Sequence, residues 1–174
     1  MVVKLFSFIL LYIPFVWNGD RYEHDSLPLF LILLTAANSW SAYQGVRFVE
    51  GPARFHRNLP LSTARVGLVY LITYTVFLLP EAAYIFWAGR HLVAPGQLAG
   101  IWSAPLATLL FLTAVQYGSG TGRDEFIKVL GGLSFVSLFF FNGEYYWRWT
   151  LVLLAIGTFL FFYNRDRFED DTAA

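Results

Sequence analysis

The sequence contains no cysteine and few charged residues. The absence of cysteine from its 174 residues excludes disulfides, thiolate metal sites, iron–sulfur clusters and cysteine nucleophiles. Only 14% of the residues are charged, whereas about a quarter is typical of a soluble domain. The charges also balance, at twelve Lys and Arg against twelve Asp and Glu, so the basic excess of a nucleic-acid-binding protein is missing. A polytopic membrane protein is the class that remains.

Long apolar stretches occupy most of the chain. Hydrophobic residues make up 57% of the sequence and aromatic residues 20%. A helix needs about 20 apolar residues to cross the roughly 30 Å of hydrocarbon in a bilayer. We therefore expect an all-α membrane helical bundle forming a single transmembrane domain over residues 1–174. Its six predicted spans lie near residues 2–17, 27–46, 65–88, 98–118, 125–141 and 146–164. One of the last two segments could instead be re-entrant.

The distribution of Lys and Arg predicts that both termini lie in the cytoplasm, because cytoplasmic loops carry an excess of these residues. In this orientation nine of them lie on the inner side and three on the outer side. The nine are Lys4, Arg47, Arg54, Arg57, Arg65, Arg123, Lys128, Arg165 and Arg167, and the three are Arg21, Arg90 and Arg148. Most tryptophans fall at the predicted outer ends, as an interfacial aromatic belt would. The expected location is the cytoplasmic membrane of a bacterium or archaeon.

Small residues recur at every fourth position of the second predicted span. Ala37, Ser41 and Gly45 would lie on one face of that helix and permit close approach of another backbone. Packing within the chain is the common reason for such a face. A seam between two copies in a dimer is the alternative.

The longest predicted cytoplasmic connection is residues 47–63, with the sequence RFVEGPARFHRNLPLST. Pro52 and Pro60 each remove a backbone donor, so we expect a short helix between them. Ser62 is suited to cap the helix that follows. The loop is either a surface segment that contacts anionic lipid head groups or a docking element for a cytoplasmic partner. The apolar anchors of such a docking element would be Phe48, Phe55 and Leu59.

The order of residues in this loop resembles the permease subunits of ABC-2 type transporters. Glu50-Gly51 is followed by Arg54 and Arg57, and Leu59-Pro60-Leu61-Ser62 leads directly into a helix. The resemblance implies that the acidic residue opens a cytoplasmic coupling helix, in a layout of six spans with both termini inside. It also implies a permease that moves a small or amphiphilic substrate, paired with a second membrane subunit in a homo- or heterodimer. The residues implicated in coupling are Glu50, Arg54, Phe55, Arg57, Leu59 and Pro60.

ATP hydrolysis is expected on a separate cytoplasmic subunit, which would bind ATP and magnesium. The chain has no G-x-x-x-x-G-K-[ST] phosphate loop. Its glycine-rich stretch, Gly118-Ser119-Gly120-Thr121-Gly122, lacks the lysine and follows no predicted strand. His56 and His91 have no carboxylate or histidine at ligand spacing, so no metal site or other cofactor is expected in this chain.

Glu81 is the one acidic residue well inside a predicted span. It lies six residues before Trp87, hence about 9 Å deeper than the aromatic belt. An ionised carboxylate at that depth must be paired, hydrated or protonated. The neighbouring Pro80 leaves the carbonyl of Val76 without its helical donor and should bend the helix. We interpret Pro80 and Glu81 as part of a translocation path or gate. A structural hydrogen bond to Asn38, Gln116 or Tyr117 is the alternative.

Two other functions compete with the permease hypothesis. The first is a small membrane-embedded enzyme that acts on a lipid-like substrate around Glu81, which would need polar groups converging at one depth. The sequence has no recognisable nucleophile–base pair and no metal-ligand set, so no catalytic residue is assigned. The second is an accessory membrane subunit without chemistry of its own.

Overall fold

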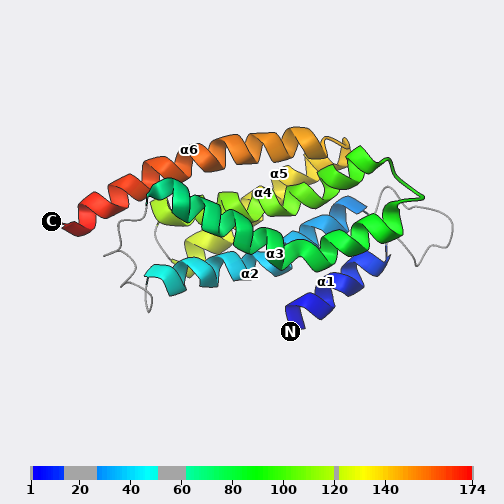
Figure 1. Cartoon of the computed structure of the whole chain (residues 1–174), viewed down its shortest axis with the longest axis horizontal. Helices are drawn as coiled ribbons and strands as arrows, with labels where there is room; N and C mark the ends of the chain where they lie inside the picture. Colours follow the sequence, from blue (N-terminus) through cyan, green and yellow to red (C-terminus); the bar gives the residue numbers. More distant parts are fainter. Residues whose placement is uncertain (1, 14–26, 51–61, 120–121, 174) are drawn as a thin grey trace.

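The computed structural model describes residues 2–13, 27–50, 62–119 and 122–173, and within these ranges the chain forms helices and no strand. Figure 1 shows them as an elongated bundle. The helices are α1 (Val2–Tyr12), α2 (Leu27–Glu50), α3 (Thr63–Gly89), α4 (Pro95–Ser119), α5 (Arg123–Asn142) and α6 (Tyr146–Ala173). The predicted all-α fold is confirmed for this part of the chain.

Each helix runs antiparallel to the one before it, and α4 lies at the centre (Figure 1). It packs along α6 and also contacts α2, α3 and α5. In the apolar segment of α4, 61% of the residues are buried, against 33% in α3 and in α6. The side chains of Leu109 and Leu112 are fully buried there. α4 is therefore the core around which the other helices are arranged.

The outside of the bundle is apolar. On α3 the side chains of Val69 and Val76 are 61% and 60% exposed, and on α5 Phe135 and Phe139 are each 64% exposed. An apolar exterior of this extent is unusual for a protein in water and typical of a surface that faces lipid. Among the described residues, three helices are long and apolar enough to cross a membrane, namely Thr63–Gly89, Pro95–Gly118 and Tyr146–Asn164. These features indicate a membrane protein.

The helix bounds differ from the expected spans mainly at the ends of the bundle. α2 continues to Glu50, into the predicted loop, and α6 continues to Ala173. α1 has 11 residues and is therefore about 16 Å long, which is only half of the roughly 30 Å of a bilayer core.

Two local features set the course of α3. Its N-cap is Ser62, whose hydroxyl accepts a hydrogen bond from the amide of Arg65 at 3.4 Å, which confirms the predicted cap. Pro80 lies inside the helix, and α3 continues through it to Gly89. The cap places the start of α3 directly after residues 51–61, which lie outside the described part of the chain.

Candidate functional site

Glu81 forms an ion pair with Lys4 of α1 inside the bundle. The Lys4 ammonium nitrogen Nζ lies 2.7 Å from Oε1 of Glu81. The Glu81 side chain is 1% exposed and the Lys4 side chain 25%. A carboxylate buried to this extent is stable in its charged form only with a close, well-oriented partner. Lys4 supplies that partner.

The three residues named as alternative hydrogen-bond partners of Glu81 bond to other groups. The side-chain amide of Asn38 donates to the hydroxyl of Ser7 at 3.1 Å. The amide of Gln116 donates to the carbonyl of Leu112 in its own helix. The hydroxyl of Tyr117 is 3.0 Å from that of Tyr70. The polar groups therefore do not converge on Glu81 as a catalytic site would require.

The position of Lys4 also differs from the one expected for an inner-face cation. It lies beside Glu81, which is nearer to the C-terminal end of α3 than to its beginning. The sequence contains one signal for this pairing. Lys4 is the lone charge in residues 2–17, and Glu81 is the lone charge in residues 66–89. Two isolated opposite charges in apolar segments are natural candidates for a buried pair.

Lys4 contacts α3 on both sides of Pro80. Its ammonium donates a hydrogen bond to the backbone carbonyl of Phe77 and lies 3.5 Å from the centroid of the Phe77 ring, a cation–π contact. Phe77 and Glu81 are one helical turn apart. Pro80 provides no amide hydrogen for the carbonyl of Val76, which weakens the helix at this turn. We call the contacts of Lys4 with Phe77 and Glu81 the Lys4 clamp, because they connect the two turns that flank the proline.

α1 runs parallel to the last part of α3. One turn beyond the Lys4 clamp, the rings of Phe8 and Tyr84 pack edge to face with centroids 6.0 Å apart. On its other side α1 contacts α2 through Ser7 and Asn38. α1 therefore lies between α2 and α3, but only along the half of the bundle that contains the C-terminal end of α3 (Figure 1).

A groove separates α2 from α3 in the other half of the bundle. We call it the α2–α3 groove. α2 contributes Ser41, Gly45 and Phe48 to its walls, and α3 contributes Val66, Tyr70 and Phe77. A Cβ atom added at Gly45 would meet only the Tyr74 hydroxyl, at 3.8 Å, so there is open space beside this glycine. Ser41 and Gly45 of the predicted small-residue face thus line a groove, and Ala37 is half-buried on the same helix.

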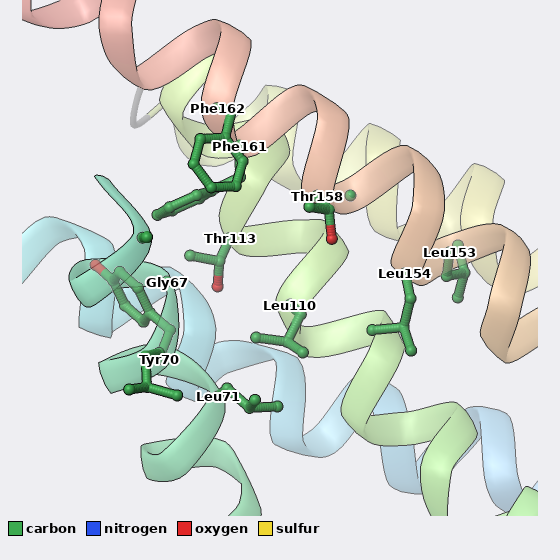
Figure 2. Close-up of a pocket in the computed structure, with 13 residues that line it drawn as sticks. Gly67, Tyr70, Leu71, Leu110, Thr113, Leu153, Leu154, Thr158, Phe161 and Phe162 are labelled. Atoms are coloured by element: carbon green, nitrogen blue, oxygen red, sulfur yellow. The ribbon is translucent and has the colours of Figure 1, made fainter. Parts of the chain in front are cut away.

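A second groove lies on the opposite side of α3, against α6, with α4 as its floor. Figure 2 shows side chains from the three helices around this space of about 310 Å³. The walls are mainly apolar, with Leu71 from α3, Leu110 from α4 and Phe161 from α6. The Thr113 hydroxyl in the floor is 2.7 Å from the Tyr74 hydroxyl. We call this space the α3–α6 groove.

The part of α3 that precedes Pro80 therefore has a groove on each side. Its buried residues are Val66, Tyr70, Tyr74 and Leu78, which recur at every fourth position and form a single row. The hydroxyls of Tyr70 and Tyr74 bond to Tyr117 and Thr113 of α4. This part of α3 is held by its one buried row, through contacts with α4 and with Phe161 of α6.

The residues predicted to couple the chain to a partner are beyond what the structure describes. Arg54, Phe55, Arg57, Leu59 and Pro60 fall within residues 51–61. Glu50 is the last residue of α2, and the position of its side chain is likewise outside the description. Their predicted role in coupling stays a prediction.

Comparison of the chain with protein-family models, curated proteins and solved structures finds no match. The geometry of the Lys4 clamp and of the two grooves is therefore the basis for assigning a function.

Proposed function

We propose that this chain is a multi-pass permease subunit of an ATP-driven transporter, which moves an amphiphilic substrate together with a separate ATP-binding subunit. One observation carries the proposal. The part of α3 that directly follows the predicted coupling loop has a groove on each side, whereas the Lys4 clamp holds the helix at Pro80. A displacement of the loop would be transmitted to a helix segment that has room to move.

Pro80 is the natural pivot for such a movement. The turn that contains it lacks one backbone hydrogen bond, so bending there costs less than elsewhere in α3. Beyond the pivot, α1 and the Lys4 clamp hold Glu81 and the residues that follow. Because the two grooves flank the same segment, its displacement toward α2 would narrow one groove and widen the other. As one groove widens and the other narrows, the apolar walls of the α2–α3 groove and of the α3–α6 groove would be exposed to a substrate in turn.

The proposed topology has the helices crossing the bilayer in alternating directions, with the N-terminal and C-terminal residues on the cytoplasmic side. The alternation in Figure 1 and the apolar exterior support it. The end of the bundle where α3 begins carries Arg47, Arg65, Arg123 and Lys128, whereas Arg90 and Arg148 lie at the other end. The positive-inside rule therefore favours a cytoplasmic position for the start of α3. A second membrane subunit, identical or related, completes the proposed transporter in a bacterial or archaeal cytoplasmic membrane.

No specific observation favours the membrane-enzyme alternative. Glu81 is paired with Lys4, and the three polar residues that were expected to converge on it bond elsewhere. We therefore do not propose a catalytic activity for this chain.

Purification in a mild detergent tests the proposal directly. We expect a second polypeptide that contains a nucleotide-binding phosphate loop to co-purify in near-stoichiometric amount. Recovery of the chain without an ATPase, even after crosslinking in intact membranes, would contradict the permease proposal.

Substitutions in the predicted coupling loop test the connection to the ATPase. Replacing Glu50 with Gln, or Arg54 and Arg57 with Ala, should uncouple ATP hydrolysis from transport, with a loss of transport of about 5- to 150-fold, the usual range for coupling between sites. The helical content and thermal stability should not change. Glu125→Gln, at an exposed acidic residue in the first turn of α5, is the matched control. Transport that stays coupled in the loop variants would argue against the proposed role of the loop.

The absence of cysteine makes a movement of α3 measurable with spin labels on introduced cysteines. One pair joins Ile72, before Pro80, to Phe159 of α6, and the control pair joins Phe86, beyond Pro80, to Leu151 of α6. All four side chains are exposed. During ATP turnover in the complex, the first distance should change by more than about 2 Å, as in hinge rearrangements. The second distance should not change. Equal changes in both pairs would exclude a pivot at Pro80.

A further inference from the structure

We infer that the α2–α3 groove binds one acyl chain of an anionic phospholipid from the cytoplasmic leaflet. The inference rests on the membrane orientation in the proposed function and adds a defined ligand to it.

The length of the groove matches one leaflet. Its α3 wall extends from Val66 to Phe77, which at 1.5 Å per residue is about 16 Å. This is half of the roughly 30 Å hydrocarbon core of a bilayer. In the other half of the bundle, α1 occupies the space between α2 and α3, from Lys4 onward. The groove therefore ends at Phe77 beside the Lys4 clamp, near the middle of the membrane in the proposed orientation.

The walls of the groove fit an alkyl chain. Phe48 and Val69 present apolar surface, and Gly45 leaves open space beside the α2 backbone. The hydroxyls of Tyr70 and Tyr74 bond to α4. The walls thus offer mainly apolar contact, with the exposed Thr73 as a polar exception. Lipid surrounds the protein at this depth, so acyl chains are the most abundant apolar groups that can enter the groove.

The two ends of the groove differ in charge. At the closed end, Phe77 covers the ammonium of Lys4, whose charge is compensated by Glu81. At the end nearer the start of α3, the exposed Arg65 lies one turn before Val69 on the same face of α3. An anionic head group would pair with Arg65 at one end of the groove. Its acyl chain would lie against Phe77 at the other end, where no uncompensated charge is present. Basic residues at the cytoplasmic surface attract anionic lipids in the same way.

Photolabelling with a defined lipid tests the inference. The full chain is reconstituted in phosphatidylcholine vesicles that contain a trace of phosphatidylglycerol with a diazirine in one acyl chain. A diazirine at the end of the chain should label the peptides around Phe77 and Ser41. A diazirine next to the glycerol should label those around Val66 and Phe48. Labelling spread evenly over the exposed helix faces would overturn the inference.

Glycine variants supply the matched controls. Gly45→Leu places a side chain in the groove and should abolish the labelling at Phe77, whereas Gly45→Ala should retain it, since a Cβ there makes only an ordinary contact. Gly131→Leu introduces the same side chain on α5, where a Cβ meets nothing within 4 Å, and should also retain the labelling. Undiminished labelling of the Gly45→Leu variant would show that the lipid lies outside the groove.

Arg65 tests the choice of head group. Arg65→Gln should reduce the preference for phosphatidylglycerol over phosphatidylcholine by about fivefold, the contribution of one basic residue at a membrane surface. Equal labelling by both lipids in the unmodified protein would refute the anionic head group. These measurements involve no ATPase, so a negative result would not affect the co-purification test. The absence of an ATPase would equally leave a positive labelling result standing.

Discussion

The segments of α3 before and after Pro80 are both largely apolar, but their surroundings differ. Among the seventeen residues Thr63–Leu79 four are buried, in one row, whereas among the nine residues Glu81–Gly89 four are buried. The difference arises because α1 packs beside the second segment, from Lys4 at Glu81 to Phe8 at Tyr84. Contact with a neighbouring helix, here α1, thus decides how firmly each segment of α3 is held. The hydropathy of the segment itself does not reveal this.

The two segments of α3 are suited to different roles, anchoring for the second and coupling to the predicted loop for the first. The segment after Pro80 has the buried ion pair and the aromatic contact of Tyr84 with Phe8, so it serves as an anchor. The segment before Pro80 follows the predicted coupling loop and has a groove on each side. If α3 is divided in this way, the Lys4 clamp should stabilise the second segment, and the α6 wall and the Ser62 cap should affect the first.

Removal of the Lys4 charge should have the largest effect. Lys4→Met leaves the Glu81 carboxylate, which is 1% exposed, without its partner, and breaking a buried pair in this way typically costs about 3–5 kcal/mol. The measurement is the free energy of unfolding in mixed micelles. Lys128→Met, which removes an exposed cation from α5, should change it by no more than about 0.5 kcal/mol.

A double variant shows whether the loss of stability in Lys4→Met comes from the unpaired Glu81 carboxylate. In Lys4→Met/Glu81→Gln neither charge remains, so the double variant should be more stable than Lys4→Met alone. A Lys4→Met variant that is no less stable than Lys128→Met would show that the Lys4 clamp does not hold the second segment of α3.

The sequence predicts the anchor only in part. The isolated charge of Glu81 required a partner, and this need follows from the position of the residue in an apolar segment. The identity of the partner depends on the register of α1 against α3, a contact between residues 77 positions apart. Periodicity and spacing report on neighbours within one helix, so they do not select Lys4 over Asn38, Gln116 or Tyr117. The lone opposite charges of two apolar segments are the signal that favours Lys4.

The grooves were beyond sequence analysis for a related reason. Ala37, Ser41 and Gly45 predict a face that permits close packing, but Ser41 and Gly45 lie beside open space. Such a space depends on how far apart neighbouring helices lie, which spacing within one helix does not report. The cap at Ser62, by contrast, was predicted correctly, because it involves residues three positions apart.

Substitution at Gly157 tests the wall opposite the first segment of α3. A Cβ at Gly157 would lie 3.2 Å from the Cα atom of Phe111, so Gly157→Ala requires a backbone shift between α6 and α4 and should cost about 1–3 kcal/mol of unfolding free energy. Gly131→Ala is the control, because a Cβ there meets nothing within 4 Å, and it should stabilise the helix by about 0.5–1 kcal/mol. Equal effects of the two variants would mean that α6 is not tightly packed on α4 and that the α3–α6 groove has no rigid wall.

The smallest expected effect is that of the helix cap. Ser62→Ala removes the acceptor for the amide of Arg65 and should cost about 1 kcal/mol, or roughly fivefold in local opening. Amide hydrogen exchange should therefore accelerate in the first turns of α3 and stay unchanged after Pro80, because the two segments are held by different contacts. Ser62→Asp keeps an acceptor at the cap and should preserve the slow exchange. Faster exchange on both sides of Pro80 in Ser62→Ala would mean that α3 opens as one unit, and the proposed pivot would then have no physical basis.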